Sequence, residues 1–223
     1  MARVLMVSKP LQPPWDDSAK NLARDLVRFS DRHEFHVLGL PGAEAPGPRA
    51  IVEPVYRGTG AYSPSLAQNL RVLRRLFRPD DREIYHFFFA PNPTTSRAAR
   101  WVRTLKPRKR LVHTICSAPA TYKGIRDLMF AHRVVALSEN TRQALLENGV
   151  EGVVRIPPGI DATTRVPPER RRAVREALGL PRDRPLVLYA GDYQFSTAAD
   201  TCARALPEIL GRSDAHFVFA CRI

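Results

Sequence analysis

The sequence predicts an α/β protein in which a doubly wound parallel sheet is followed by the beginning of a second unit of the same kind. Short runs rich in Val, Ile, Leu and Phe alternate with segments of helical spacing, as a parallel sheet with crossover helices requires. After Pro158 this pattern is interrupted by a proline-rich stretch and then starts again. With 44% hydrophobic and 26% charged residues, the chain has enough apolar material for a core.

The expected strands of the first unit are short runs enriched in β-branched and aromatic residues. They comprise residues 3–8, 34–40, 50–56, 84–90, 110–116, 133–138 and 153–157. Continuous apolar runs of this length are typical of strands that are buried on both faces.

Helices are expected between most of these strands. The first, residues 17–30, begins with Asp17 or Ser18 as its N-cap and is expected to carry Leu22, Leu26, Val27 and Phe29 on one side. The last is closed by Gly149, a typical C-terminal glycine. The remaining helices are expected at residues 64–77, 94–105, 122–131 and 139–148.

The stretch VVRIPPGID, residues 153–161, predicts a connection between two domains. Its prolines hold the backbone extended, and Gly159 permits a sharp change of direction. We therefore assign residues 1–158 to a first domain, residues 159–180 to a connector with one helix, and residues 181–223 to the start of a second domain.

The second unit is expected to contain helices at residues 168–178 and 196–210 and strands at residues 185–191 and 215–221. A sheet of two parallel strands cannot cover its own faces, because parallel strands are buried on both sides. We therefore expect this unit to be incomplete, with its remainder beyond Ile223.

The net charge of +13 arises from 35 Lys and Arg residues against 22 Asp and Glu residues. Much of the excess lies in residues 71–78, 106–110 and 169–175, which we interpret as a solvated basic face; a surface that meets an anionic membrane or a nucleotide is the alternative. The three cysteines have no close spacing, so a reducing compartment is expected, without a disulfide framework. No run reaches the length of a membrane span. We expect a cytoplasmic protein, and the basic surface leaves open a peripheral contact with the inner face of the membrane.

Ligands of doubly wound sheets bind beyond the carboxyl ends of the strands. After the first strand come Trp15, Asp16, Asp17 and Ser18. Two adjacent aspartates at a helix start oppose phosphate and suit sugar hydroxyls better. We take these four residues as candidate substrate ligands; capping by Asp17 and packing of Trp15 on the rim are the alternative.

The fourth and fifth strands carry further candidates. His86 lies within a strand, where a buried, hydrogen-bonded imidazole is the main alternative to a catalytic role. Asn92 follows the same strand and could bind a ligand or cap the next helix. Cys116 and Ser117 end the fifth strand, and His113 is expected on the opposite face from Cys116, which excludes a Cys-His pair within this strand.

The sixth strand leads to Ser138 and Glu139, where a helix N-terminus could meet a ligand or Ser138 could act only as its cap. The chain contains no G-x-G-x-x-G, no P-loop, no H-E-x-x-H and no G-x-S-x-G. Their absence excludes the most recognisable nicotinamide, nucleotide-triphosphatase, zinc-protease and hydrolase signatures, and no metal site is predicted.

The order of several segments resembles glycosyltransferase family four. The segments are ARVLMVSKPLQPPWDDSAKNLARDL, IYHFFFAPNP, KRLVHTICSAP, AHRVVALSENTRQALLENGV, VVRIPPGID and REALGLPRDRPLVLYAG. This family comprises retaining enzymes of the GT-B fold that use nucleotide sugars. The resemblance implies two Rossmann-like domains that face each other across a cleft, and it covers nearly the whole chain.

The resemblance also implies roles for parts of the chain. The acceptor, a sugar, lipid-linked or small molecule, would bind mainly to the first domain, and a UDP- or GDP-sugar mainly to the second, without a covalently bound cofactor or an obligatory metal. Catalysis would rest on positioning and on stabilising the departing diphosphate. The full-length protein would be a hexosyltransferase-like enzyme. The pair of glutamates that relatives use on the donor would lie beyond Ile223, so this chain alone is expected to be inactive.

Individual positions follow from the same resemblance. Cys116 occupies the place of the family's usual histidine, and His86 is the other candidate for a catalytic role. Gly159 and Asp161 correspond to the hinge between the domains. The donor side would include Gly191, Asp192 and Ser196, the last two near positions where relatives place Arg and Lys.

Two other hypotheses remain from the sequence. The runner-up is a noncatalytic basic α/β module that binds a polyanion such as RNA or an anionic membrane. No aromatic-basic RNA signature is present, so nucleic acid is not the expected partner. The third hypothesis is a glycosyltransferase-like scaffold that has lost its chemistry, to which Cys116 and Asp192 point.

Overall fold

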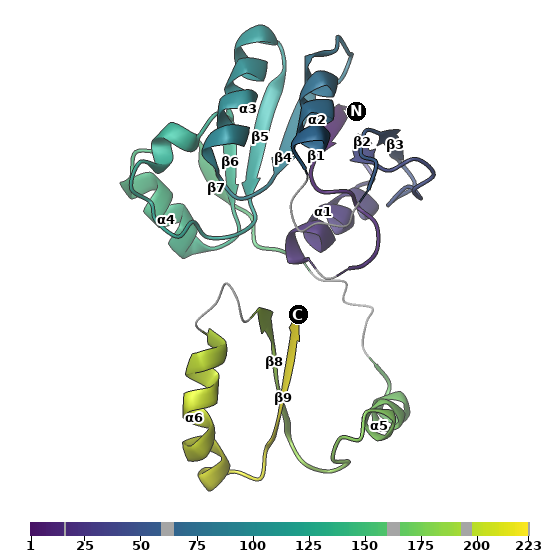
Figure 1. The fold of residues 1–223 in the computed structure, drawn as a ribbon, viewed down its shortest axis with the longest axis vertical. Coiled ribbons are helices and arrows are strands. Elements are labelled where there is room, and N and C mark those ends of the chain that lie inside the picture. Colours follow the sequence, from purple (N-terminus) through teal and green to yellow (C-terminus); the bar gives the residue numbers. More distant parts are fainter. Residues whose placement is uncertain (16, 59–64, 160–165, 193–197, 223) are drawn as a thin grey trace. The chain divides into compact units, whose positions relative to one another are not determined.

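The computed structural model describes residues 1–15, 17–58, 65–159, 166–192 and 198–222. The chain divides into two compact units, Met1–Gly159 and Ile160–Ile223, and each is described by itself (Figure 1). Within the described residues, the strands of the two units belong to separate sheets.

The first unit is a seven-stranded sheet in the order β3-β2-β1-β4-β5-β6-β7, and all neighbouring strands are parallel. Its elements are β1 (Arg3–Val7), α1 (Ser18–Arg28), β2 (Glu34–Gly39), β3 (Ala50–Pro54), α2 (Leu66–Phe77), β4 (Ile84–Phe88), α3 (Pro93–Leu105), β5 (Arg110–Ile115), the 3₁₀ helix η1 (Ile125–Leu128), β6 (Arg133–Ala136), α4 (Glu139–Glu147) and β7 (Val153–Arg155). The order reverses between β1 and β4, which confirms the predicted doubly wound α/β fold.

Both faces of this sheet are covered, as parallel strands require. Leu5 and Phe87 point to the face under α2 and α3, where Val102 joins them in one buried cluster. Met6 is the next residue along β1 and points to the other face, where it packs with Val27 of α1. Figure 1 shows α2 and α3 side by side on their face of the sheet.

Side-chain caps begin several of the helices. Ser65 and Gln68 form a reciprocal capping box at the start of α2. At α4, the hydroxyl of Ser138 accepts a hydrogen bond from the Thr141 amide at 3.2 Å. Gly149 follows this helix with a φ of 75°, a left-handed conformation that favours glycine. The predicted roles of Ser138 as a cap and of Gly149 as a terminator are confirmed.

The predicted helix over residues 122–131 is wrong, because only the short η1 forms there. Gly124 precedes η1 with a left-handed φ of 72°, and no side chain caps the exposed amides. The backbone is extended again at Met129, so that Phe130 reaches the core with its ring centre 5.0 Å from that of Phe87. Tertiary packing therefore outweighs the helical spacing of this segment.

The second unit contains α5 (Pro168–Ala177), β8 (Leu186–Asp192), α6 (Ala198–Arg212) and β9 (His216–Arg222). β8 and β9 are parallel neighbours, so these elements lie where the sequence predicts a βαβ unit. Val187 is 39% exposed and Leu188 is 61% exposed. Neither face of this two-stranded sheet is closed by the described residues of the unit, as its small size requires.

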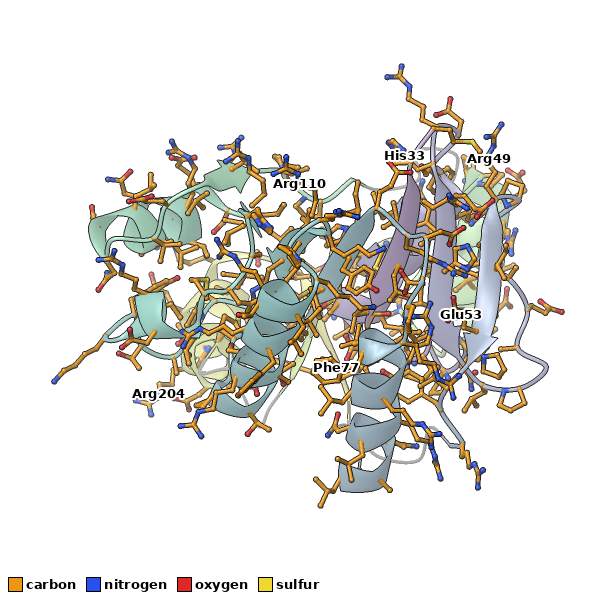
Figure 2. All side chains as sticks on the ribbon, turned by 90° about the horizontal axis from the view of Figure 1, so that it is seen from above. His33, Arg49, Glu53, Phe77, Arg110 and Arg204 are labelled. Atoms are coloured by element: carbon orange, nitrogen blue, oxygen red, sulfur yellow. The ribbon has the colours of Figure 1, made fainter. Side chains whose placement is uncertain are left out.

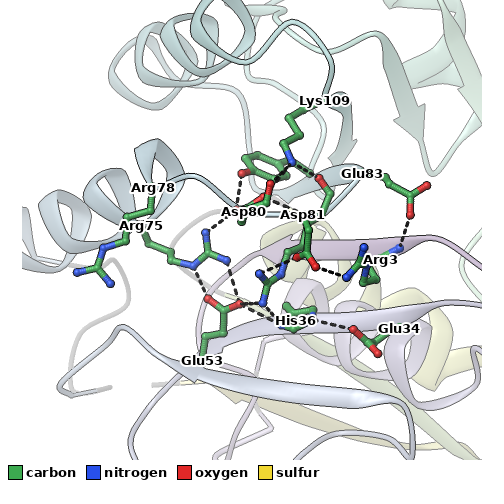
Figure 3. A network of polar contacts seen from close by, with 12 residues as sticks. Arg3, Glu34, His36, Glu53, Arg75, Arg78, Asp80, Asp81, Glu83 and Lys109 are labelled. Atoms are coloured by element: carbon green, nitrogen blue, oxygen red, sulfur yellow. Dashed lines mark hydrogen bonds and ion pairs between the residues drawn. The ribbon is translucent and has the colours of Figure 1, made fainter.

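A network of buried charges lies where α2 ends and β4 begins (Figure 3). The carboxylate of Asp80 is 3% exposed and accepts hydrogen bonds from Arg75 Nη1 at 2.7 Å, Tyr85 Oη at 2.7 Å and Lys109 Nζ at 3.0 Å. Burial alone would raise the pKa of Asp80, but the hydrogen bonds from Tyr85, Arg75 and Lys109 hold it well below its usual range. Asp80 therefore stays ionised inside the protein.

Glu53 of β3 extends this network to the edge of the sheet. Its Oε1 lies 2.9 Å from Arg75 Nη2, 3.1 Å from Arg82 Nη2 and 3.0 Å from His36 Nδ1. These contacts connect β2 and β3 to the turn before β4. They fix the position of the strands, and they balance the charge of the Glu53 carboxylate.

The network corrects part of the prediction of a solvated basic face, since Arg74, Arg78 and Arg108 of the same segments are exposed. Arg75, Lys106 and Lys109 come from two of the basic segments, yet their side chains are only 10%, 13% and 15% exposed. Lys106 donates to Tyr85 Oη at 2.7 Å. These three cations are largely buried because a carboxylate or a hydroxyl lies within reach of each.

We expect Asp80→Asn to lower the free energy of unfolding by roughly 3 to 5 kcal/mol, since it leaves Lys109 buried without its countercharge and Arg75 with Glu53 as its remaining carboxylate partner. The control is Asp81→Asn, whose side chain is 56% exposed and whose loss should cost less than about 1 kcal/mol. Urea unfolding at neutral pH measures both. Equal losses in the two variants would show that the Asp80 network does not stabilise the fold.

Candidate functional site

The carboxyl edge of the sheet brings several predicted segments together. β1, β4, β5 and β6 are consecutive neighbours in the sheet. The loops that follow them, which include residues 8–15, 89–92, 116–121 and 137–138, therefore leave the sheet along one edge. This is the place where doubly wound proteins bind their ligands.

Asp17 ends the first loop and is the N-cap of α1. Its Oδ1 accepts hydrogen bonds from the amides of Ala19 at 2.9 Å and Lys20 at 3.2 Å, while its Oδ2 pairs with Lys9 Nζ at 2.6 Å. Burial alone would raise the pKa of Asp17, but Lys9 and the two amides lower it. The carboxylate is therefore ionised and already engaged, as the capping alternative expects.

Trp15 forms the rim of this loop and is 38% exposed. The guanidinium of Arg24 lies 4.5 Å from the ring centre, and the ammonium of Lys20 lies 5.7 Å from it. The carbonyl of Trp15 accepts from Asn21 Nδ2 at 3.2 Å, while the buried Oδ1 of Asn21 has no hydrogen-bond partner in the described part of the chain. Ser18 is exposed in the first turn. An indole face with cations beside it is thus presented at the edge.

Cys116 lies at the end of β5, on the face of the sheet that α1 covers. Burial and, to a smaller extent, the charge of Asp17 raise the pKa of its thiol to about 12, while Lys9 opposes this shift. The Sγ atom donates to the carbonyl of Thr114 at 3.5 Å. A thiol that is protonated at neutral pH is neither a general base nor an activated nucleophile.

His86 is a partly buried residue in the middle of β4. Its Nε2 lies 2.8 Å from Thr114 Oγ1, and its ring centre lies 4.7 Å from that of Phe88. Desolvation lowers the pKa of His86 to about 3, and the nearby His113 contributes to this. The imidazole is neutral and lies below the edge, so the geometry favours the structural alternative over a catalytic role.

His113 points to the opposite face of β5 from Cys116, as expected. It is fully buried and stacks on Phe130, with ring centres 4.8 Å apart. Its Nε2 lies 3.0 Å from the carbonyl of Phe89, and burial lowers the pKa of His113 to about 4. His113 and Cys116 therefore form no catalytic pair.

The remaining candidates of the first unit are divided between caps and surface groups. Asn92 Oδ1 accepts from the amide of Thr95 at 2.9 Å, which makes it the N-cap of α3. Ser138 caps α4, and Glu139 pairs with Arg142 at 2.7 Å. Ser117 is exposed after β5. Asn92, Ser138 and Glu139 thus already have partners within the chain, whereas the exposed Ser117 remains a candidate ligand.

The donor-side and hinge candidates lie at the second unit and the connector. At Gly191 a Cβ atom would lie 2.5 Å from Tyr189 Oη, so a larger residue there would require the Tyr189 side chain to move. At Gly159 a Cβ atom would meet nothing within 4 Å, so packing does not require glycine there. Asp16, Asp161 and Ser196 lie outside the described residues, and Asp192 is described only as the last residue of β8.

Two residues at the edge were missed by the sequence argument. Lys9 pairs with Asp17 and influences Cys116; its place directly after a strand was the signal that could have identified it. The buried hydroxyl of Tyr56 donates to the carbonyl of Ser8 at 2.7 Å and so anchors the start of the first loop. No local pattern reveals this contact, which joins residues 48 positions apart.

A hollow of about 420 Å³ lies beside the Asp80 network and is lined by Arg78, Arg82 and Ile51 among others. It lies near the amino end of β4, so it is separate from the loops described above. No group of three or more His, Cys, Asp or Glu side chains within the described ranges is placed to hold a metal ion. Of the helices that the structure describes, none has the length and hydropathy needed to cross a membrane.

Comparison with known families decides the class of protein. The family model for Glycosyltransferase Family 4 matches residues 18–164, about two thirds of the chain. The chain belongs to this family. The match includes every helix of the first unit and the loops after β4, β5 and β6, and it begins directly after the loop that follows β1.

Two curated relatives carry the name D-inositol 3-phosphate glycosyltransferase. The one from Xylanimonas cellulosilytica is 42% identical over 144 residues, which cover 56% of this chain and 34% of the relative. The one from Kineococcus radiotolerans is 37% identical over 83 residues, 36% of this chain and 19% of the relative. The matched regions thus span about a third or less of these family members.

Two solved structures of Anabaena Alr3699/HepE share the fold. The complex with UDP and glucose has a TM-score of 0.61 at 15% identity, and the complex with UDP-glucose has a TM-score of 0.59 at 13% identity. Each covers 100% of this chain, which in turn covers 70% of that protein. The agreement supports the Rossmann-like, GT-B type of architecture for this family 4 chain.

We expect the free energy of unfolding to fall as the pH drops from 6.5 towards 4. His86 and His113 have folded pKa values of about 3 and about 4, against 6.5 for an ordinary histidine. Their stabilising effect is fully present above pH 6.5 and is lost on acidification, because the unfolded chain binds protons that the folded chain does not. Each histidine adds up to about 1.4 kcal/mol per pH unit to the slope of the free energy of unfolding against pH.

His113→Phe tests this assignment, since phenylalanine keeps the stacking on Phe130 and removes the proton. Urea unfolding between pH 7 and about 4.5 should give a shallower loss of stability for this variant. His33→Gln, outside the His86 and His113 pair, is the control and should keep the slope of the unmodified chain. An unchanged slope in His113→Phe would refute the assignment.

Proposed function

We propose that this chain is part of a retaining glycosyltransferase that transfers a hexose from a nucleotide sugar to an acceptor held at the carboxyl edge of the first unit. The observation that carries this proposal is the family 4 match over residues 18–164, because it includes most of the loops at that edge. The second unit, residues 160–223, would provide the first elements of the donor domain.

The donor to test first is a UDP-sugar, with a GDP-sugar as the comparison. Both solved structures of Anabaena HepE contain UDP or UDP-glucose. On the chain itself, Gly191 lies next to the last residue of β8, and its missing side chain leaves room for the Tyr189 hydroxyl. A backbone without a side chain at such an edge permits close approach of a nucleotide diphosphate.

The acceptor that suits the first edge is a phosphorylated polyol. The two curated relatives are named for inositol 3-phosphate. The indole of Trp15 offers an apolar face for a ring of C–H groups, and Arg24 lies beside it as a phosphate ligand. Asp17 opposes phosphate less than its sequence position suggests, because Lys9 neutralises its carboxylate.

The chemistry of this edge is positioning. Neither the protonated Cys116 nor the neutral His86 is a base near neutral pH, because burial shifts both pKa values away from 7. The first unit would therefore contribute by holding the acceptor oxygen in reach of the donor. Stabilisation of the departing diphosphate would be supplied from the donor side.

Saturation-transfer NMR of the 223-residue chain with inositol phosphate tests the acceptor site. We expect binding that Trp15→Ala and Arg24→Ala each weaken about tenfold, the equivalent of about 1.4 kcal/mol. Arg110→Ala is the matched control, since this exposed arginine begins β5 at the other edge of the sheet. No binding by the folded chain, or an equal loss in Arg110→Ala, would refute the acceptor site.

The intact protein, incubated with UDP-glucose and the acceptor, tests the reaction itself. NMR of the anomeric proton should show a product that keeps the configuration of the donor. A product of inverted configuration would contradict the retaining assignment. If the protein turns over neither UDP-sugars nor GDP-sugars, the proposed glycosyltransferase activity is wrong.

A further inference from the structure

We infer that the outer surface of α2 and α3 docks onto an anionic lipid bilayer. This surface is defined by Leu66, Leu70, Leu73 and Phe77 of α2, Trp101 and Leu105 of α3, and Arg71, Arg74, Arg78, Arg97, Arg100 and Arg108 around them. The inference is independent of sugar transfer, because none of these residues belongs to the acceptor edge described above.

α2 is apolar on two sides. Its inner side carries Val72 and Leu76, which pack on the core of the sheet. Leu66, Leu70 and Phe77 lie on the outer side and are 76%, 56% and 37% exposed. Together with Leu73 they are spaced by four, three and four residues, which places their side chains in a stripe along one side of the helix. The core therefore does not account for this second stripe.

α3 widens the stripe into a surface. Trp101 is 64% exposed and Leu105 is 60% exposed, four residues apart on one side of the helix. α2 and α3 contact each other on the same face of the sheet. Figure 2 shows both helices on one side of the sheet in a second view, with Phe77 at the end of α2. Exposed apolar groups on two adjacent helices exceed the scattered apolar residues of an ordinary surface.

The charge around this surface has one sign. Residues 54–79 and 84–126 contain no Asp or Glu. Arg74, Arg97 and Arg100 are exposed on the two helices, and Arg78 is exposed directly after α2. The three acidic residues between the two stretches have partners outside this surface: Asp80 is buried in its network, Asp81 pairs with Arg3 and Arg82, and Glu83 accepts from the Arg3 amide.

This charge pattern indicates which partner binds to the surface. A second copy of the chain would place arginine against arginine, which opposes a symmetric dimer through this face. An anionic bilayer offers phosphate for the arginines and acyl chains for the leucines. Trp, Leu and Phe interleaved with Arg is the composition of surfaces that lie at the membrane interface. Each arginine near an anionic leaflet adds to the attraction, which salt weakens.

Flotation of the 223-residue chain with lipid vesicles tests the docking surface. We expect binding to phosphatidylcholine vesicles in which about a third of the lipid is phosphatidylglycerol, and at least about tenfold weaker binding to pure phosphatidylcholine. Leu70→Gln with Trp101→Gln, and Arg74→Glu with Arg100→Glu, should each weaken binding at least about tenfold. Circular dichroism confirms that the variants are folded.

Two matched controls separate this surface from general effects. Leu26→Gln with Leu146→Gln changes two exposed leucines of α1 and α4, each 39% exposed. Arg32→Glu with Arg126→Glu makes the same change in net charge at exposed positions outside α2 and α3. Both control variants should bind the anionic vesicles as the unmodified chain does.

Tryptophan fluorescence reports insertion directly. The chain has two tryptophans, so Trp15→Phe leaves Trp101 as the reporter. A blue shift with anionic vesicles supports docking. Absence of vesicle binding, full binding by the Leu70→Gln, Trp101→Gln variant, or binding of an acidic helical peptide or polyuridylate in place of vesicles would overturn the inference.

Discussion

Parallel pairing of β1 with both β2 and β4 is the constraint on which the rest of this structure depends. Val4 is paired with Phe35 on one side and with Ile84 on the other, so the connections leave β1 in two directions. Right-handed crossovers then place α1 on one face and α2 and α3 on the other. The same pairing aligns the loops after β1, β4, β5 and β6 along one edge, which creates the candidate site.

The two ends of the strands in the first sheet differ in how their polar groups are buried. Near the amino end of β4, Asp80 and Glu53 hold cations in low-dielectric surroundings, where each charge depends on its partner. At the carboxyl edge, Trp15 and Ser117 are left to solvent, and Asp17 is secured by Lys9 and two amides. Rigidity at one end and accessible groups at the other are what a binding edge needs.

Family membership and local chemistry together limit what this domain contributes. Cys116 has a thiol that stays protonated, and His86 has an imidazole that stays neutral, so the first unit provides shape and charge more than acid-base chemistry. The outer surface of α2 and α3 adds a second property that the sugar-transfer proposal does not require. Its apolar stripe faces away from the core, so neither folding nor the acceptor edge accounts for it.

The sequence by itself determined the alternation of strands and helices, the caps at Ser138 and Gly149, and the break after Pro158, because these depend on periodicity and on the conformations of a few residues. Only the tertiary structure decided that residues 122–131 are not a helix, that Arg75 and Lys109 are buried, and that Cys116 lies beside Asp17 and Lys9. Burial and ion pairing depend on neighbours brought from distant positions in the chain, and no local pattern records those neighbours.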